Sequence, residues 1–283
     1  FIEHEREHAD CFFRLKTKPK DNASLDFSAL SQTLQSAIWM GKAKRLSPNH
    51  FYRWPIIDEI ATQTEKPGTS VERWQPPNLP LPPPSHNLPA SRLFRQRRSA
   101  QQFNGKAEDL LLADFHRMML ALLPNAKPPF TAWNWSPQVH MVLFVHRVAG
   151  LEPSLYILVR DAKDLPELKQ AFSTDFVWAK AVVPYDLYLL SAGNVRQAAK
   201  TLSCHQPIAS DSFFSLGMLT RFAENVKAEP WRYRRLFWES GLLGQILYLE
   251  AEAASVRGTG IGCFFDDAVH GVLCLLDDHW QSL

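Results

Sequence analysis

Four arginines and a serine form the group of side chains in this sequence that is best suited to binding an anion. They are Arg92, Arg95, Arg97, Arg98 and Ser99. Guanidinium groups carry forked donors that match the oxygens of a phosphate in pairs, and a neighbouring hydroxyl adds another donor. These residue types suit a phosphate site, but composition alone favours the alternative, a solvated arginine face near a helix end. A nucleic-acid interface has thin support, because the cluster is short and the net charge of the chain is only +2.

A second candidate is a run of backbone that carries glycine at every other position. Gly258, Gly260 and Gly262 precede Cys263. Backbone without side chains can lie close to a flat ligand and donate N–H groups to it. The glycine spacing alone favours the other interpretation, a tight turn into a buried strand. A dinucleotide loop of the Rossmann type is disfavoured, because that loop follows a strand and precedes a helix, and here the order is reversed.

Two further patterns match a known kind of metal-binding or catalytic site. His4, Glu5 and His8 match the zinc pattern in which two histidines share a helix face and a glutamate acts as base. The segment lacks an apolar face and a third ligand, so we predict no metal site, and a zinc hydrolase stays as an alternative. Cys204 and His205 are neighbours in sequence, but adjacent side chains diverge, so we predict a packing role rather than a catalytic pair.

The elements that would position these residues follow from the spacing of apolar side chains. A wide buried face predicts a central helix over residues 241–256, ending at Arg257-Gly258, where glycine can take the left-handed conformation. The same spacing predicts helices over residues 27–40, 108–123, 194–202 and 213–226. Apolar runs bounded by turn residues predict strands over residues 139–148, 155–160 and 185–190.

A proline-rich stretch divides the chain. Proline lacks a backbone donor and fixes its own backbone, so this stretch is predicted to be an extended connector. We therefore predict an N-terminal partial lobe over residues 1–74, a linker over residues 75–90 and a main domain over residues 91–283.

Composition excludes several classes of protein. Hydrophobic residues make up 46% and charged residues 21% of the 283 positions, which is typical of a globular protein. No apolar run reaches the ~20 residues that cross a bilayer, and no secretion signal opens the sequence. Its four cysteines, which include Cys11 and Cys274, are scattered without a CxxC pair. We predict a cytoplasmic protein that binds neither membrane nor nucleic acid.

Two distant motifs together resemble a known family. They are RRSAQQF at residues 97–103 and GQILYLEAEAASVRGTGIGCFFDD at residues 244–267. They resemble the nitroreductase-like flavoproteins, in particular the SagB-type dehydrogenase and thiazoline-oxidase branch, and the resemblance covers about residues 50–283. It implies an α+β fold with a mainly antiparallel sheet wrapped by helices, a central buried helix, and a strand after the glycine-rich loop.

The resemblance also implies FMN as cofactor and a set of residues that bind it. The matching positions are Arg97, Arg98, Ser99, Gln245, Gly260, Ile261, Gly262 and Cys263. The first three match positions that hold the FMN phosphate and ribityl chain. The last four match the loop whose backbone faces the flavin N5 edge, and Gln245 matches a polar helix position whose partner is the flavin or a paired domain. No catalytic residue is assigned, because positioning over N5 does most of the work in this fold.

The implied function is hydride transfer through flavin N5 to or from a small-molecule or peptide substrate, with NAD(P)H as a candidate reductant. FMN would lie between two such domains, in a homodimer or with a tandem neighbour. The sequence departs from the branch at two places. The Lys-Tyr pair before the central helix is represented only by Lys227, and residues 134–137 replace a Pro-Ser-Gly-Gly type loop. These departures favour an alternative, a flavin-free structural or peptide-recognition lobe.

Overall fold

The computed structural model describes residues 26–38, 40, 54–68, 74–83, 86–132, 134–275 and 277–283. The chain divides into two compact units, Phe1–Ile60 and Ala61–Leu283, which are described separately. In the first unit, α1 (Phe27–Ser36) begins at Asp26, whose carboxylate accepts the Ser28 and Ala29 N–H groups at 2.9 and 3.1 Å. Helix α2 (Pro55–Gln63) crosses the division. His4, Glu5, His8 and Cys11 lie outside the described residues.

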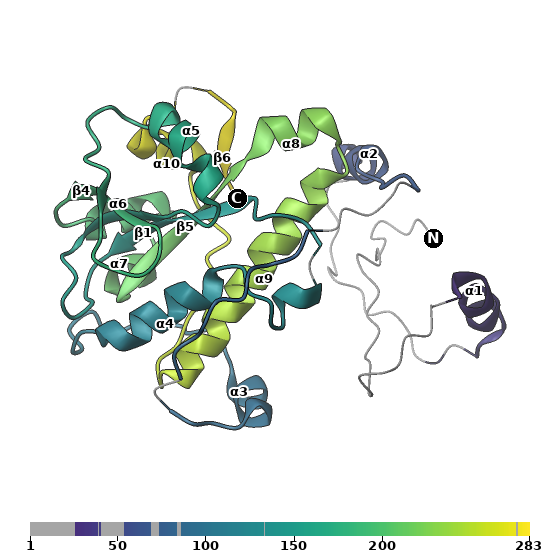
Figure 1. Ribbon diagram of the computed structural model, residues 1–283, viewed down its shortest axis with the longest axis horizontal. Helices are drawn as coiled ribbons and strands as arrows, with labels where there is room; N and C mark the ends of the chain where they lie inside the picture. Colours follow the sequence, from purple (N-terminus) through teal and green to yellow (C-terminus); the bar gives the residue numbers. More distant parts are fainter. Residues whose placement is uncertain are drawn as a thin grey trace. The chain divides into compact units, whose positions relative to one another are not determined.

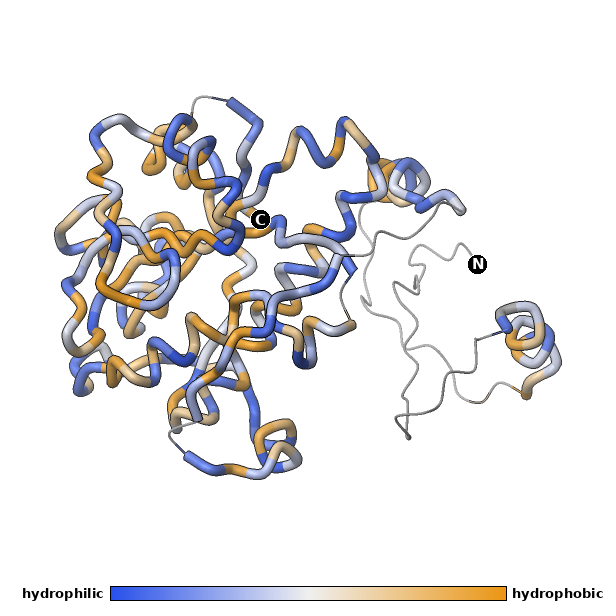
Figure 2. The backbone as a smooth tube through the Cα atoms, viewed as in Figure 1, coloured by the Kyte–Doolittle hydropathy of each residue, from blue (hydrophilic) through white to orange (hydrophobic). Residues whose placement is uncertain are grey.

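The second unit is built on a six-stranded antiparallel sheet with the order β3-β4-β2-β1-β5-β6. Its strands are β1 (Val139–Val145), β2 (Ser154–Leu158), β3 (Ala179–Lys180), β4 (Leu187–Ala192), β5 (Phe214–Arg221) and β6 (Trp280–Ser282). Every residue of β1 and β2 is buried, so helices must cover both faces of the sheet. The hydrophobic colouring of the strands in Figure 2 follows from this double burial.

The described helices that lie wholly within the second unit include those that cover the two faces of the sheet. They are α3 (Ala90–Gln96), α4 (Leu112–Leu122), α5 (Leu165–Ala171), α6 (Arg196–Leu202), α7 (Pro207–Asp211), α8 (Phe222–Ala228), α9 (Arg232–Ala253) and α10 (Asp266–Leu273), with short 3-10 turns at Phe130–Ala132 and Ala162–Asp164. Helices α4 and α9 pack side by side (Figure 1) and share a core cluster with Leu143. Helices α5, α6 and α10 share the other cluster with Val142. The predicted α+β fold class is confirmed.

The strands over residues 139–148, 155–160 and 185–190 are found as β1, β2 and β4, each within a few residues of its predicted ends. The helix predicted over residues 213–226 is wrong. Residues 214–221 form β5, which pairs with β1 along its whole length, and only residues 222–228 are helical. The physical reason is the alternation of Phe214, Leu216 and Met218, which places three apolar side chains on one face of a strand.

The strand expected after Cys263 is also wrong, because α10 follows the glycine-rich loop. Asp266 and Asp267 stand in the first turn of α10, where carboxylates interact favourably with the helix dipole. Val269 and Leu273, four residues apart, are buried on one face of the helix.

The central helix is present, but its ends differ from the prediction. Helix α9 begins at Arg232 and ends at Ala253, well before Gly258. Ser255 takes the left-handed conformation, with φ of 59°. The Ser255 N–H donates to Glu252 O at 3.1 Å and the Val256 N–H donates to Ala251 O at 2.9 Å. These are the two bonds of a Schellman cap, formed here by a serine instead of the expected glycine.

The first half of the proline-rich stretch is bonded to the rest of the second unit at three carbonyl groups. Ala126 N–H donates to Pro77 O at 2.8 Å, and the Asn125 side chain donates to Leu79 O. Arg117 of α4 donates to Pro82 O and forms a bidentate ion pair with Glu250 of α9, at 2.6 and 3.1 Å. The stretch therefore lies against the core, and the three-part division at residues 75–90 stays a prediction.

A buried ion pair joins α9 to the sheet. Glu239 is fully buried and pairs with Arg160, whose side chain is also buried. The Glu239 carboxylate accepts the N–H groups of Gln138 at 3.1 Å and Val139 at 3.3 Å. Arg160 in turn donates to Val139 O at 2.8 Å and to Leu122 O at 2.7 Å. One pair of charges thus connects α9, α4 and the start of β1.

Replacing Glu239 by glutamine is expected to lower the free energy of unfolding by about 3–5 kcal/mol, because Arg160 then stays buried without a counter-charge. Chemical denaturation monitored by circular dichroism measures the change. Lys180→Ala is the control, since it breaks an ion pair whose lysine side chain is 54% exposed and should leave the stability unchanged within error. Equal stability of Glu239→Gln and the unmodified protein would contradict this role for the pair.

Candidate functional site

The two sequence motifs meet at one side chain of α9, Tyr248. Its hydroxyl accepts the Gly260 N–H at 2.6 Å and lies 2.9 Å from Ser99 Oγ. The neighbouring backbone is joined as well, because the Ala100 N–H donates to Gly258 O at 3.0 Å. The arginine-serine segment and the glycine-rich loop, about 160 positions apart in the sequence, therefore lie side by side in the fold.

The two predicted arginines behave differently. The Arg97 guanidinium lies over the Tyr248 ring, 5.1 Å from its centroid, and has neither a hydrogen bond nor an ion pair in the described structure. Arg98 is exposed and folds back on the chain, donating to Arg95 O at 3.0 Å and to Arg97 O at 2.7 Å. Arg97 is thus the guanidinium that is held in place with its donors free, next to Ser99.

The loop after α9 brings bare backbone against Tyr248. A Cβ atom at Gly258 would lie 3.8 Å from the Tyr248 ring, and one at Gly260 would lie 3.6 Å from its hydroxyl. The Gly260 N–H is already bonded to Tyr248. Several other backbone N–H groups of this loop, including those of Thr259, Ile261 and Gly262, have no partner within the described residues and are donors that the loop can offer.

A cavity of about 430 Å³ lies between the glycine-rich loop, α9 and β5. This volume is within the range of small-molecule and cofactor sites. The loop contributes residues 258–261, and α9 contributes Gly244, Leu247, Tyr248 and Ala251. The lining is mostly apolar, as a site for a flat ring system requires.

Strand β5 forms the floor of the cavity, and part of its outer edge is open. Strand β6 pairs only with residues 219–221, and the Leu283 N–H then donates to Met218 O at 2.9 Å. Backbone groups of alternate residues point the same way in a strand, so those of Phe214 and Leu216 also face this side. No hydrogen bond meets them in the part of the chain that the structure describes. The cavity therefore offers main-chain donors and acceptors from two of its walls.

One end of the cavity is polar. Arg147 lies over the Phe213 ring, 4.8 Å from its centroid, and donates to the carbonyl oxygens of Asn104 and Asp211 at 3.0 Å each. Burial lowers the pKa of Arg147, and Arg196 nearby lowers it further. Burial also lowers the pKa of the adjacent His146 to about 4, although its bond to the Ala209 carbonyl opposes the shift. His146 is therefore neutral at pH 7 and serves packing rather than proton transfer.

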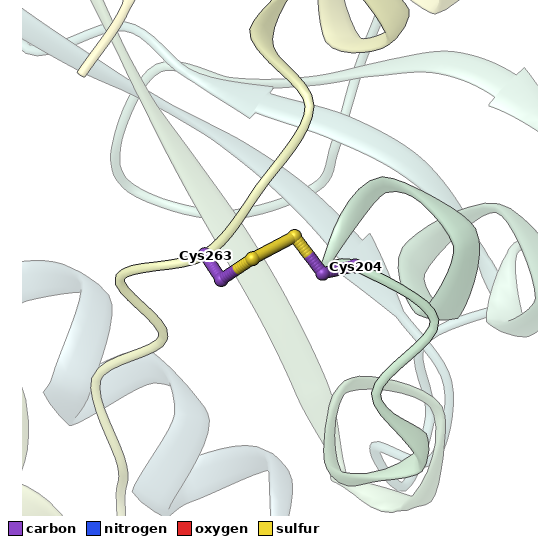
Figure 3. Close-up of a disulfide and its surroundings, with 2 residues drawn as sticks. All are labelled: Cys204 and Cys263. Carbon is purple, nitrogen blue, oxygen red and sulfur yellow. A yellow bond between two sulfur atoms is a disulfide. The ribbon is translucent and has the colours of Figure 1, made fainter.

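A disulfide joins the glycine-rich loop to the turn after α6. Cys204 and Cys263 are bonded, with their Cα atoms 5.8 Å apart (Figure 3). A separation of 59 positions and the lack of a local pattern explain why the sequence did not reveal this pair. Cys204 is thus neither a nucleophile nor a simple packing residue. The sulfur atom of Cys263 is bonded to that of Cys204.

The predicted site residues fall into three groups. Gly260 and Ile261 line the cavity, and Arg97 and Ser99 contact the tyrosine that lines it. Arg98, Gln245, Gly262 and Cys263 are exposed and are not part of the cavity lining. Sequence reasoning missed Tyr248, whose spacing identified it only as part of the buried helix face. Among the described residues, no group of three His, Cys, Asp or Glu side chains could hold a metal ion, and no helix could span a membrane.

No model of a known protein family matches this sequence, and no curated protein matches it either. Solved structures do resemble it. A protein from Anabaena variabilis assigned as a nitroreductase superposes with a TM-score of 0.51 at 22% identity, over 67% of this chain and 35% of that chain. A protein from Ralstonia eutropha with the same assignment gives 0.44 at 13% identity, over 77% and 95% of the two chains.

A chain of the Escherichia coli microcin synthetase McbBCD complex, with truncated pro-MccB17 bound, gives a TM-score of 0.48 at 16% identity, over 80% of this chain and 83% of that chain. Among these three structures, the Anabaena protein gives a TM-score above 0.5, and this chain spans about a third of its length. At this identity the likeness concerns the fold alone, and the shared fold is that of a protein assigned as a nitroreductase.

Replacing Tyr248 by phenylalanine is expected to cost about 1 kcal/mol of stability, because the Gly260 N–H and Ser99 both lose a partner. The Gly260 amide should also exchange faster with deuterium. Tyr233→Phe is the matched control, since Tyr233 lies on the same helix and its hydroxyl makes no hydrogen bond in the described structure. If both variants behave alike, Tyr248 does not organise the site.

Proposed function

We propose that this chain is an FMN-dependent oxidoreductase of the nitroreductase type, related to the SagB-type dehydrogenases. It would transfer hydride through flavin N5 to or from a small-molecule or peptide substrate. The observation that carries the proposal is the meeting of Arg97, Ser99 and the glycine-rich loop at Tyr248, beside the cavity. The nitroreductase fold supports it independently of any motif.

The front segment fits a phosphate. The Arg97 guanidinium keeps all its donors free while the Tyr248 ring fixes its position. Ser99 adds a hydroxyl, and Arg98 is exposed one residue away. A dianion beside this segment would gain charge-assisted hydrogen bonds without first breaking an ion pair of Arg97.

The cavity fits a flat aromatic ring. Its walls are mainly apolar, and its lining includes Thr259 and Ile261, whose N–H groups have no partner within the described residues. Because the Gly260 N–H is bonded to Tyr248, the donor toward a ring would come from a neighbouring residue of the loop. Apolar walls would also exclude water from the ring.

When bound, FMN supplies two-electron hydride chemistry at its N5 atom. The contribution of this chain is then binding and orientation. Arg97 and Ser99 would hold one end of the ligand, and the loop after α9 would hold the other. His146 is neutral and buried, and Arg147 is occupied by backbone carbonyls, so neither is assigned a proton-transfer role. NAD(P)H stays the candidate reductant, and no catalytic side chain is assigned.

Two observations favour the second candidate, a flavin-free lobe that supports a modification enzyme or recognises a peptide. The Gly260 N–H is satisfied within the chain, and Arg98 folds onto its own backbone. A visible spectrum of the purified chain separates the two candidates. Flavin absorption bands support the oxidoreductase, and a colourless protein that FMN does not stabilise against unfolding supports the lobe.

Replacing Arg97 and Arg98 together by alanine is expected to weaken FMN binding by about tenfold or more, because at least one charge-assisted hydrogen bond is lost. Isothermal titration of the apo protein with FMN measures the affinity. Arg92→Ala with Arg95→Ala is the matched control, since it removes the same charge from exposed positions on α3. Equal losses in the two double variants would show a general charge effect and contradict a phosphate site at Arg97.

The proposal includes a second domain on the open face of α9, from a homodimer or a tandem neighbour. Phe237 is 47% and Trp238 is 37% exposed on this helix. A Cβ atom at Gly241 or Gly244 would meet nothing within 4 Å, so another backbone could approach closely there. Gly244 and Tyr248 also line the cavity, so a partner on this face would cover it. Exposed aromatic residues around small ones are typical of interface cores.

Sedimentation velocity tests this partner. We expect the unmodified chain to sediment as a dimer and Trp238→Glu to sediment as a monomer, because a buried carboxylate without a partner is costly. Val182→Glu is the control, since Val182 is a fully exposed apolar residue elsewhere on the unit. A monomeric unmodified chain would remove the homodimer and leave only a tandem neighbour.

A further inference from the structure

We propose that the Cys204–Cys263 disulfide is a redox-sensitive staple that fixes one wall of the cavity. In the oxidised protein it would hold the glycine-rich loop against the turn after α6. Reduction would release the loop between Gly260 and Phe265 while the sheet and α9 keep their structure. The inference concerns the chain's own covalent state and does not require FMN.

The bond lies directly at the cavity. Ser203, next to Cys204, and Ile261, two residues before Cys263, both belong to the cavity lining. Figure 3 shows the bond connecting the two backbone segments that carry these residues. Two non-covalent contacts described by the structure join the same segments. They are the hydrogen bond from the Phe265 N–H to Leu202 O at 2.9 Å and the edge-on contact between the Phe265 and His205 rings, whose centroids lie 5.8 Å apart. The disulfide is the covalent part of this attachment.

Few other contacts hold the loop at this place. The backbone N–H groups of residues 261–264 make no hydrogen bond within the described structure, and Gly260 and Phe265 are the nearest residues that do. The side chains of Ile261 and Phe264 pack against the second core cluster and are only partly buried. After loss of the bond, the loop would be held by the packing of these two side chains and by the contacts of Gly260 and Phe265 at its ends. Such sparsely held segments are typical of regions that open locally.

The other segment is under backbone strain that the bond helps to maintain. Cys204 and His205 have φ values of 52° and 58°, in the left-handed region that non-glycine residues seldom adopt. Two such residues in succession persist only where the surrounding structure holds them. When the bond breaks, the turn can relax toward ordinary φ values, and Ser203 moves with it. The glycine-rich loop and the turn after α6, which the disulfide joins, would then both become less constrained.

The bond is accessible to a reductant. Cys263 is exposed, and Cys204 is half-buried. A dithiol reductant balances the reaction. Its thiolate attacks Cys263 Sγ, and the bond to Cys204 breaks. The Cys204 sulfur leaves as a thiolate and takes up a proton. The second thiol of the reductant then displaces Cys263, which is released as a thiol while the reductant becomes a disulfide. Two electrons have passed to the protein and two protons are bound.

Thermodynamic linkage would couple ligand binding in the cavity to the redox state of the Cys204–Cys263 disulfide. A ligand that binds the cavity tenfold more tightly when the wall is fixed must stabilise the disulfide by the same factor. For a two-electron couple, tenfold corresponds to about 30 mV of reduction potential. The redox state of the surroundings would thereby set the affinity of the cavity.

The test uses the full chain with Cys11→Ser and Cys274→Ser, so that the pair alone can react. Hydrogen–deuterium exchange is followed by mass spectrometry before and after reduction by dithiothreitol, with alkylation to count free thiols. We expect the hydrogen-bonded amides that flank the disulfide, those of Ser203, Gln206, Gly260 and Phe265, to exchange about tenfold faster after reduction. Amides of β1 and β2 should not change. Cys204→Ala with Cys263→Ala in the same background should match the reduced protein, with or without reductant.

Three results would overturn the proposal. Two free thiols in the protein purified without reductant would show that the staple does not form. Unchanged exchange after complete reduction would show that the other contacts hold the wall. Faster exchange throughout the sheet would show that the bond supports the whole fold rather than one wall. None of these outcomes bears on FMN binding, so the staple and the flavin site fail or stand separately.

Discussion

The buried pair of Glu239 and Arg160 is the constraint on which the arrangement depends. It fixes the first half of α9 to the start of β1 and to the end of α4. Since α9 is a single helix of 22 residues, whatever fixes Glu239 also fixes Tyr248, two and a half turns further on. The Arg117–Glu250 ion pair fixes the far half in the same way. Ion pairs on the core side of α9 thus hold the helix in place, and Tyr248 of the site lies on its open side.

The parts of this fold that sequence reasoning predicted are those whose burial is uniform. Strands β1 and β2 are buried at every position, so each appears as a mostly apolar run. The core face of α9 is equally plain in the spacing of Leu243 and Ile246. For the site, the residue types predicted anion binding at Arg97 and bare backbone at Gly260, and the family resemblance predicted that the two belong together. Their meeting at Tyr248 is the geometric outcome.

The structural features that sequence reasoning did not predict have physical causes that cannot be recognised in a single sequence. Strand β5 borders the cavity and is only partly buried, so its pattern lacks the contrast that separates a strand from a helix. Helix α9 ends early because Ser255 accepts the left-handed conformation that we assigned to Gly258. Tyr248 could not be distinguished from a core residue, since its function depends on a loop twelve positions ahead. The disulfide depends wholly on tertiary proximity.

The strand order has a consequence for how the chain acquires its structure. Strands β1 and β2 are neighbours in sequence and can form a hairpin early. Strand β5 pairs with the other side of β1. For these two strands to pair, the whole chain between Val145 and Phe214 must form a closed loop. Non-local antiparallel pairing of this kind slows folding. We therefore expect the strand that forms the floor of the cavity to pair late in folding. Until then, the unpaired edge of β1 can be bound by chaperones or by other partly folded chains.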